Sequence, residues 1–159
     1  MYPVLILAFV LVPNWAKSQD YNNAIGLRAG LTSGLTIKHF MGNSRAIEGI
    51  IGIWPYSTSI TGLYEVYKGA GAAGLNWYYG GGAHASFYTG RIYYNRYYDR
   101  YYRAYDDHAF GLDLILGLEY KIPEIPFALS LDIKPFLEIH RGGGTYTALD
   151  PGLGLKIAF

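Results

Sequence analysis

The residues best placed to perform chemistry in this chain of 159 residues are a histidine and a serine two positions apart. His84 and Ser86 have the same parity, so they would point to the same side of a strand. With an acid such as Glu65 or Asp113 they would form a hydrolase triad, in which the histidine activates the serine. A lone His-x-Ser pair is a weak signal, however, and a histidine packed among polar side chains explains it more simply. We therefore expect no catalytic residues.

Other kinds of site are excluded more firmly. The chain has no cysteine, which removes disulfides, thiolate zinc sites and thiol nucleophiles. The glycine runs 80–82 and 142–144 are not followed by Lys-Ser or Lys-Thr, so neither is a phosphate-binding loop. The net charge of +1 gives no field that would attract nucleic acid. We expect no metal, no cofactor and no nucleic-acid partner.

The candidate residues lie in segments where apolar and polar residues alternate, which is the pattern of β-strands. The two clearest segments are 110–121, with Leu112 on one face and Asp113 on the other, and 127–140. Both exceed the usual strand length of five or six residues and are long enough to cross a membrane at a tilt. Shorter or noisier alternation covers 46–53, 59–66, 75–87 and 152–159.

The segment 24–40 keeps one parity throughout and is either one long strand or two strands. In the second case the three-residue loop 32–34 joins them, with Gly34 in the left-handed conformation. A loop of that length preserves parity, so alternation does not decide. Two strands bring the total to eight, which returns both ends of the chain to one side of a barrel. The long loop 89–107 then lies opposite the short turns, which we expect near Gly42, Ala70 and Pro123.

Residues 4–12 form an apolar run that is flanked by two prolines. Its length suits the hydrophobic region of a secretory signal peptide and is too short for a transmembrane helix. Ala16 and Ser18 supply the small residues of a cleavage site, so we expect a leader of residues 1–18 and a mature domain of residues 19–159. No basic residue follows the first methionine, so we expect the natural start codon to lie upstream. The alternative is a short buried helix, which the prolines disfavour.

The composition favours a sheet that faces lipid. Hydrophobic residues make up 51% of the chain and charged residues only 16%, with 21 glycines and 17 tyrosines. Small residues and single charges dominate the polar faces, as a crowded barrel interior requires. Aromatic residues fall near strand ends, where interfacial girdles belong: Trp54, Tyr56, Trp77, Tyr120, Phe127 and Phe159. We predict an all-β, eight-stranded, antiparallel up-and-down transmembrane β-barrel, with the tyrosines divided between girdles and one loop.

The end of the chain carries a family resemblance. Phe159 closes the alternating run 154–159, which is similar to the C-terminal signal that the outer-membrane barrel assembly machinery recognises. Together with the leader, it makes the chain resemble small bacterial outer-membrane barrels of the OmpX and OmpA-transmembrane type. The runs 75–80, 117–121 and 128–135 resemble, more narrowly, the small uncharacterised barrels common in Bacteroidota.

The resemblance implies a location in the outer membrane of a Gram-negative bacterium, in contact with the lipid bilayer and lipopolysaccharide. It implies insertion by the barrel assembly machinery and brings no catalytic residues; we expect a monomer. Some eight-stranded outer-membrane enzymes modify lipid A, and the His-x-Ser pair resembles the lipid A deacylase pattern. Such an enzyme needs its triad to face the bilayer, whereas His84 and Ser86 fall on the predicted interior face.

If the apolar faces meet lipid, the polar faces carry ionisable side chains into the barrel: Arg28, Lys38, Glu48, Glu65, His84, Asp113, Glu119, Asp132, Lys134, Glu138 and Lys156. Isolated charges in so narrow a space are costly, so we expect them to pair into a network. The simplest interpretation is a structural polar core, because an eight-stranded barrel is just wide enough to be filled by side chains. The alternative is a narrow pore or a small-ligand pocket. Acids outnumber bases in this set, so a pore would prefer cations.

The loop 89–107 repeats Tyr-Tyr-x-Arg at a period of four residues. Tyrosine rings with interleaved arginines can stack on sugars or on a partner's aromatic side chains. We expect this loop to be extracellular, with these candidate recognition residues: Tyr93, Tyr94, Arg96, Tyr97, Tyr98, Arg100, Tyr101, Tyr102 and Arg103. Its partner would be a surface glycan or a neighbouring outer-membrane protein. The alternatives are strands that extend past the membrane with interfacial aromatics, or low-complexity drift. We expect a structural or surface-interaction role for the whole protein.

Overall fold

The structure, a computed structural model, describes residues 21–54, 57–88, 93–95, 100–102 and 107–159, with the backbone alone at 93–95, 100–102 and 107. The predicted leader lies outside the described residues. The barrel strands are β1 (Asn23–Ala29), β2 (Gly34–Phe40), β3 (Arg45–Trp54), β4 (Ser57–Ala72), β5 (Leu75–Tyr88), β8 (Asp107–Lys121), β9 (Phe127–His140) and β10 (Thr145–Ala158). Two further strands, β6 (Tyr93–Asn95) and β7 (Arg100–Tyr102), pair with each other.

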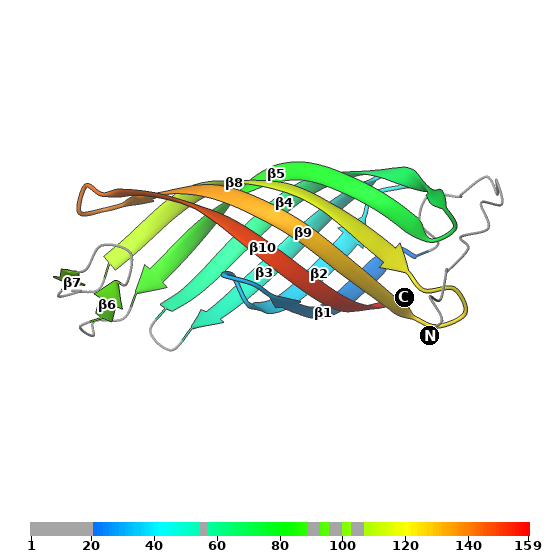
Figure 1. Ribbon diagram of the computed structural model, residues 1–159, viewed down its shortest axis with the longest axis horizontal. Coiled ribbons are helices and arrows are strands. Elements are labelled where there is room, and N and C mark those ends of the chain that lie inside the picture. Colours follow the sequence, from blue (N-terminus) through cyan, green and yellow to red (C-terminus); the bar gives the residue numbers. More distant parts are fainter. Residues whose placement is uncertain (1–20, 55–56, 89–92, 96–99, 103–106) are drawn as a thin grey trace, which may run out of the picture.

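The eight strands close into a barrel (Figure 1). Strands that follow one another along the barrel pair antiparallel, and β1 closes the circle by pairing with β10. The prediction of an all-β, eight-stranded, antiparallel up-and-down barrel is therefore confirmed. In the part of the chain that the structure describes, no helix is long and apolar enough to cross a bilayer.

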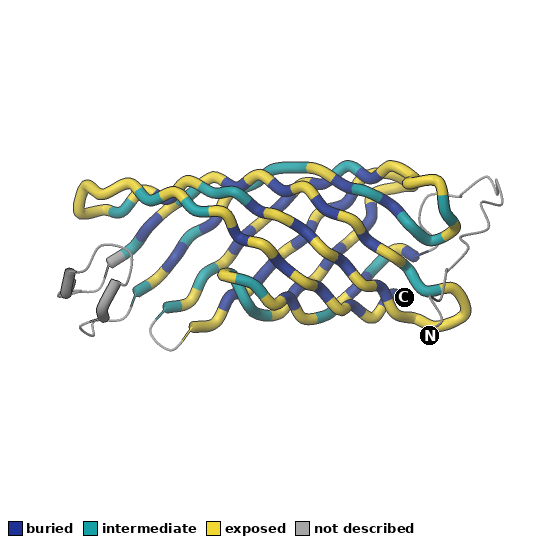
Figure 2. The backbone as a smooth tube through the Cα atoms, in the orientation of Figure 1, coloured by how far each residue is buried: buried dark blue, intermediate teal, exposed yellow. Residues whose placement is uncertain are grey.

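The strands bury every second residue, because successive side chains in a strand point to opposite faces. On β8, Leu112 and Leu114 are exposed, whereas Asp113 and Ile115 are buried. The same alternation runs along the other strands and crosses the barrel wall as a chequered pattern (Figure 2). A register slip of one residue would turn the charged side chains outwards and the leucines inwards, so the pattern fixes the register.

Residues 24–40 form two strands, β1 and β2, but the loop between them differs from the prediction. The connection is residues 30–33, and Gly34 begins β2 without a positive φ. The Ser33 hydroxyl donates to the Gly30 carbonyl oxygen at 2.6 Å, and the Gly30 N–H donates to the Ser33 Oγ at 3.0 Å. The serine side chain closes the turn, so no left-handed glycine is needed. The predicted three-residue loop with a left-handed Gly34 is wrong.

Both ends of the barrel sequence lie at one end of the barrel. Asn23 and Phe159 exchange two backbone hydrogen bonds of 2.8 Å, and the turns 41–44, 73–74 and 122–126 lie at this same end. The small sheet of β6 and β7 lies at the opposite end in Figure 1. The turn expected near Ala70 is displaced, because β4 continues to Ala72 through an irregular register.

The strands are strongly tilted. The register is followed around the barrel through the successive partners Leu27, Leu35, Ile51, Ile60, Ala85, Phe110, Ile139 and Thr145. On β10, Thr145 lies ten residues before Leu155, which is the residue that pairs with Leu27. The path around the barrel therefore returns to β1 ten residues away from its starting point. A shift of ten residues over eight strands corresponds to a tilt of roughly 43°.

The wall of the barrel is low at the β1–β2 hairpin. The last β10 residue with a β1 partner is Leu153, so residues 145–152 have no strand partner on that side. Because Asn23 and Phe159 exchange both bonds, the odd-numbered residues of β10 point their N–H groups towards β1. The first odd residue beyond the hairpin is Pro151, which has no N–H to leave unpaired.

Two interior glycines make room for large side chains on the neighbouring strand. Gly117 faces Tyr78 in the register, and a Cβ atom added to Gly117 would lie 2.5 Å from the tyrosine ring. Gly111 faces His84, and its added Cβ would lie 2.1 Å from the imidazole. Such separations are far shorter than van der Waals contact, so these positions require glycine for packing of the interior.

Candidate functional site

The structure buries all eleven side chains that were expected inside the barrel, and none is more than 8% exposed. Each of the eight barrel strands contributes at least one of them. Charged side chains alternate with outward apolar residues along every strand, so closure of the sheet brings them together inside. They form three connected clusters along the barrel.

The cluster nearest the chain ends is centred on Lys38. Its ammonium lies 2.8 Å from Glu65 Oε2, 3.0 Å from Glu48 Oε2 and 3.4 Å from Glu119 Oε2. Lys156 adds a second cation, 3.1 Å from Glu48 Oε1 and 3.5 Å from Glu119 Oε2. Three carboxylates therefore share two ammonium groups, and all five side chains are almost completely buried. Removal of either partner of such a pair would leave an uncompensated charge in a low dielectric.

A row of four buried aromatic rings lies beside this cluster, with two edge-to-face contacts and one stacked contact. Ring centroids are 4.9 Å apart for Tyr21 and Phe40, 5.0 Å for Phe40 and Tyr67, and 5.0 Å for Tyr67 and Tyr78. The Lys38 ammonium donates to the Tyr67 hydroxyl and lies 4.7 Å from the Tyr78 centroid. The expectation that tyrosines occupy only girdles and the loop is wrong for Tyr21, Tyr67 and Tyr78. Charged side chains alone do not fill the interior here, and these buried rings occupy the remaining space.

The second cluster joins Arg28 and Lys134 to three aspartates. Arg28 Nη2 lies 2.6 Å from Asp132 Oδ1, and Nη1 donates to Asp150 Oδ2 at 2.9 Å. The Lys134 ammonium lies 2.8 Å from Asp113 Oδ1 and 3.7 Å from Asp150 Oδ2. Two cations again face three carboxylates.

Asp150 was missed by the sequence analysis, yet it is fully buried. Its carboxylate accepts the backbone N–H groups of Leu31 at 2.7 Å and Thr32 at 3.2 Å, so it holds the tip of the β1–β2 hairpin against β10. Asp150 has the parity of Lys156, which is the signal that could have found it. The predicted strand began at Gly152 and stopped short of it.

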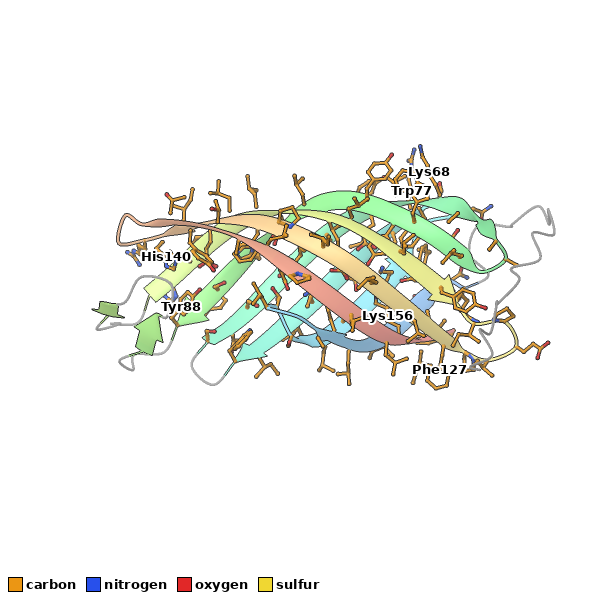
Figure 3. The ribbon with its side chains drawn as sticks, viewed as in Figure 1. Lys68, Trp77, Tyr88, Phe127, His140 and Lys156 are labelled. Atoms are coloured by element: carbon orange, nitrogen blue, oxygen red, sulfur yellow. The ribbon has the colours of Figure 1, made fainter. Side chains whose placement is uncertain are left out.

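At the other end of the barrel, Glu138 collects four donors. Glu138 Oε2 accepts the Ser86 hydroxyl at 2.9 Å and lies 3.0 Å from His84 Nε2. Glu138 Oε1 accepts the Tyr88 hydroxyl at 2.9 Å and lies 3.0 Å from His140 Nε2. Figure 3 shows Tyr88 and His140 together at this end, and their ring centroids are 5.6 Å apart.

The arrangement around His84 differs from that of a nucleophile and its base. The His84 Nδ1 atom lies 2.7 Å from Asp113 Oδ2, so both ring nitrogens face carboxylates. The Ser86 hydroxyl donates to Glu138, and Glu65 lies in the Lys38 cluster. A serine nucleophile must instead donate to the histidine. His84 links the second cluster to Glu138.

The interior is packed as well as charged. Lys38, Lys134, Tyr67 and Tyr78 are at most 1% exposed. A water-filled channel would leave the side chains that line it exposed, so no such channel passes these residues. Among the described residues, no group of three or more His, Cys, Asp or Glu side chains is arranged to hold a metal ion.

The outer surface is the reverse of the interior. Large apolar side chains are exposed on every barrel strand, for example Leu27, Leu35, Ile51, Ile60, Phe87, Leu114, Leu131 and Leu153. Of the aromatic residues expected near strand ends, Trp54, Tyr120, Phe127 and Phe159 are exposed, Trp77 is half-buried, and Tyr56 lies outside the described residues.

The backbone of the tyrosine-rich loop is described in two short pieces. Tyr93 pairs with Tyr102, Tyr94 with Tyr101 and Asn95 with Arg100, which makes a small antiparallel ribbon. The other candidate recognition residues, Arg96, Tyr97, Tyr98 and Arg103, lie outside the described residues.

Comparison with protein-family models, with curated proteins and with solved structures finds no match for this chain.

Proposed function

We propose that the protein is an integral outer-membrane β-barrel with a filled polar interior and a structural or surface-interaction role. The observation that carries the proposal is the inverted surface, in which leucine, isoleucine and aromatic side chains face outwards and the ion pairs lie inside. In water such a surface would be an aggregation hazard, whereas in a bilayer it is the stable arrangement.

The dimensions of the apolar surface support this proposal. On β8 the outward apolar residues run from Phe110 to Tyr120. Ten residue steps at about 3.3 Å, with a tilt of roughly 43°, span about 24 Å along the barrel axis. The apolar band of outer-membrane barrels is about 25 Å tall. The apolar run 4–12 and the alternating run 154–159, which we interpret as a leader and an assembly signal, agree with export and with insertion by the barrel assembly machinery.

A lipid-facing charge gives a sharp test. Leu114 is 64% exposed, so Leu114→Arg would cost almost nothing if the barrel were surrounded by water. In a bilayer the same change places a guanidinium near the middle of the apolar band and should cost about 2–4 kcal/mol. The measurement is urea unfolding of protein refolded into phosphatidylcholine vesicles. Thr145→Arg, at the exposed end of β10, is the matched control and should change stability little.

Gel migration provides the second test. A barrel extracted from membranes should migrate differently before and after boiling, because sodium dodecyl sulfate does not unfold it at room temperature. Identical migration of the two samples would reject the membrane barrel.

A narrow cation-preferring pore is the alternative function, since seven buried carboxylates face four buried Lys and Arg side chains. The packed interior favours the structural role, so we expect no steady conductance in planar bilayers. Glu119→Ala and Asp132→Ala would each open space in a different cluster. If neither variant conducts, the pore is rejected. Cation-selective current through the wild-type protein would instead replace the structural proposal.

We propose no catalytic role, because Ser86 and His84 both bind Glu138. Mass spectrometry of lipid A with and without expression tests this directly, and a mass difference would contradict it.

The loop 89–107 is the proposed contact with other molecules at the cell surface. Deletion of residues 92–105 should leave heat-modifiable migration unchanged and should reduce binding to a surface glycan or to another outer-membrane protein. Unchanged adhesion and pull-down profiles would remove the recognition role.

A further inference from the structure

The outer surface carries a pair of cations that the interior network does not use. Arg45 begins β3 and Lys68 lies near the end of β4, and both side chains are exposed. Arg45 faces Val66 in the register, so Lys68 occupies the diagonal position on the same face. Diagonal positions in an antiparallel pair are about 7–8 Å apart. At this spacing of their strand positions, two long side chains can reach one anion between them.

Two aromatic rings flank one of these cations. The Lys68 ammonium lies 5.6 Å from the Trp77 ring centroid and 5.8 Å from the Tyr79 centroid. The two rings stack with centroids 5.4 Å apart. Figure 3 shows Lys68 and Trp77 together on the outside of the barrel, towards the end that carries the short turns. Tryptophan and tyrosine prefer the level of lipid headgroups, so this group lies at an interface of the proposed membrane.

Almost all of the described carboxylates lie inside the barrel. Of the eight Asp and Glu side chains that the structure describes, seven are buried, and the exposed one, Glu124, lies in the turn between β8 and β9. Among the described residues, no ion pair joins Arg45 or Lys68 to a carboxylate. Within the part of the chain that the structure describes, these two neighbouring cations face outwards without a carboxylate partner.

We propose that Arg45 and Lys68, with Trp77 and Tyr79, bind the phosphate of an anionic phospholipid in the leaflet that faces the chain termini. This inference rests on the proposed membrane location. The guanidinium and the ammonium hold the phosphate, and the two rings lie against the glycerol and upper acyl chains. Exposed apolar side chains continue from this point towards the middle of the barrel, at Ile47 on β3 and Tyr64 on β4, where the acyl chains lie. A soluble anion would bind the two cations but would not make these apolar contacts.

Tryptophan quenching by brominated lipid tests the site with the protein's own reporter. The chain has three tryptophans, of which Trp15 lies in the predicted leader. In the mature chain, Trp54→Phe leaves Trp77, inside the proposed site, as the single tryptophan. The protein is refolded into phosphatidylcholine vesicles that contain either brominated phosphatidylglycerol or brominated phosphatidylcholine, at low salt.

The expected result is a relative association constant about five- to tenfold in favour of phosphatidylglycerol, since each surface cation adds to the attraction for anionic lipid. Lys68→Gln with Arg45→Gln should reduce this preference to about twofold or less, and high salt should weaken it. Arg141→Gln is the matched control, because it removes one exposed cation at the opposite end of the barrel.

The outcomes separate this inference from the function on which it rests. Equal quenching by both lipids would overturn the lipid site and leave the membrane barrel intact. No quenching by either lipid would show that Trp77 does not face a bilayer, which would overturn both. A preference that survives the double substitution would assign the selectivity to another surface and overturn the site.

Discussion

Asp150 is the residue whose replacement tests the interior most directly. Its carboxylate accepts a hydrogen bond from Arg28, lies 3.7 Å from the Lys134 ammonium, and accepts the N–H groups of Leu31 and Thr32. Asp150→Asn keeps the shape and one acceptor oxygen but removes the charge. Arg28 and Lys134 then retain one carboxylate each, Asp132 and Asp113.

The magnitude follows from these contacts. Breaking a buried ion pair costs about 3–5 kcal/mol when a charge is left without a partner. Here both cations keep a second carboxylate, so the loss for Asp150→Asn should lie near the lower end, about 3 kcal/mol. Asp150→Ala also deprives the two loop N–H groups of their acceptor, and should cost about 1–2 kcal/mol more.

The assay is equilibrium unfolding in urea of protein refolded into phosphatidylcholine vesicles, followed by tryptophan fluorescence and by the fraction of heat-modifiable protein. Glu124→Gln, which removes an exposed carboxylate, is the control and should change the free energy of unfolding by less than about 0.5 kcal/mol. Combining Arg28→Gln with Asp150→Asn completes a double-mutant cycle, with an expected coupling of about 1.5–3 kcal/mol. A loss below about 1 kcal/mol for Asp150→Asn, or coupling near zero, would refute the reasoning.

Two further predictions concern glycines and use the same assay. Gly117→Ala should destabilise the barrel by about 1–3 kcal/mol because the methyl group meets the Tyr78 ring, whereas Gly62→Ala adds a methyl group to open space on the outer face and should not. Equal effects of the two changes would contradict the packing argument. Gly143→Ala should cost about 1–2 kcal/mol because Gly143 has a φ of 92°. Gly142, in the same turn with open space around it and no positive φ, should tolerate alanine, and equal losses at the two positions would show that backbone conformation is not the cause.

The alternation of apolar and polar residues predicted most of the fold. Strict alternation along 110–121 and 127–140 fixes which side chains face inwards, because closure of a sheet leaves only two faces. The same rule buries Arg28 and Asp132, which are far apart in the sequence but form an ion pair inside the closed barrel. The number of strands followed from an argument about topology, since alternation alone left the segment 24–40 undecided.

What parity could not supply was the partner of each charge and the ends of each strand. The contact between Arg28 and Asp150 depends on the ten-residue shift of the barrel register, which no local pattern reveals. The predicted strand 152–159 stopped short of Pro151, although Pro151 lies within β10 at an edge position that proline tolerates. Tyr67 and Tyr78 have the parity of interior residues, but the high tyrosine content of the chain suggested that they belong to an aromatic girdle. The hairpin 30–33 is closed by a serine side chain, a device that glycine-based turn rules do not anticipate.

The low wall at the β1–β2 hairpin has a consequence for engineering this protein as a display scaffold. In the proposed orientation, a peptide inserted between Gly142 and Gly143 would emerge from the tall side of the barrel, clear of the membrane and open to antibodies. A peptide inserted between Thr32 and Ser33 would emerge at the level of the lipid and would separate Asp150 from the loop that it holds. The two hairpin tips point the same way, but only the first is a usable site for presentation.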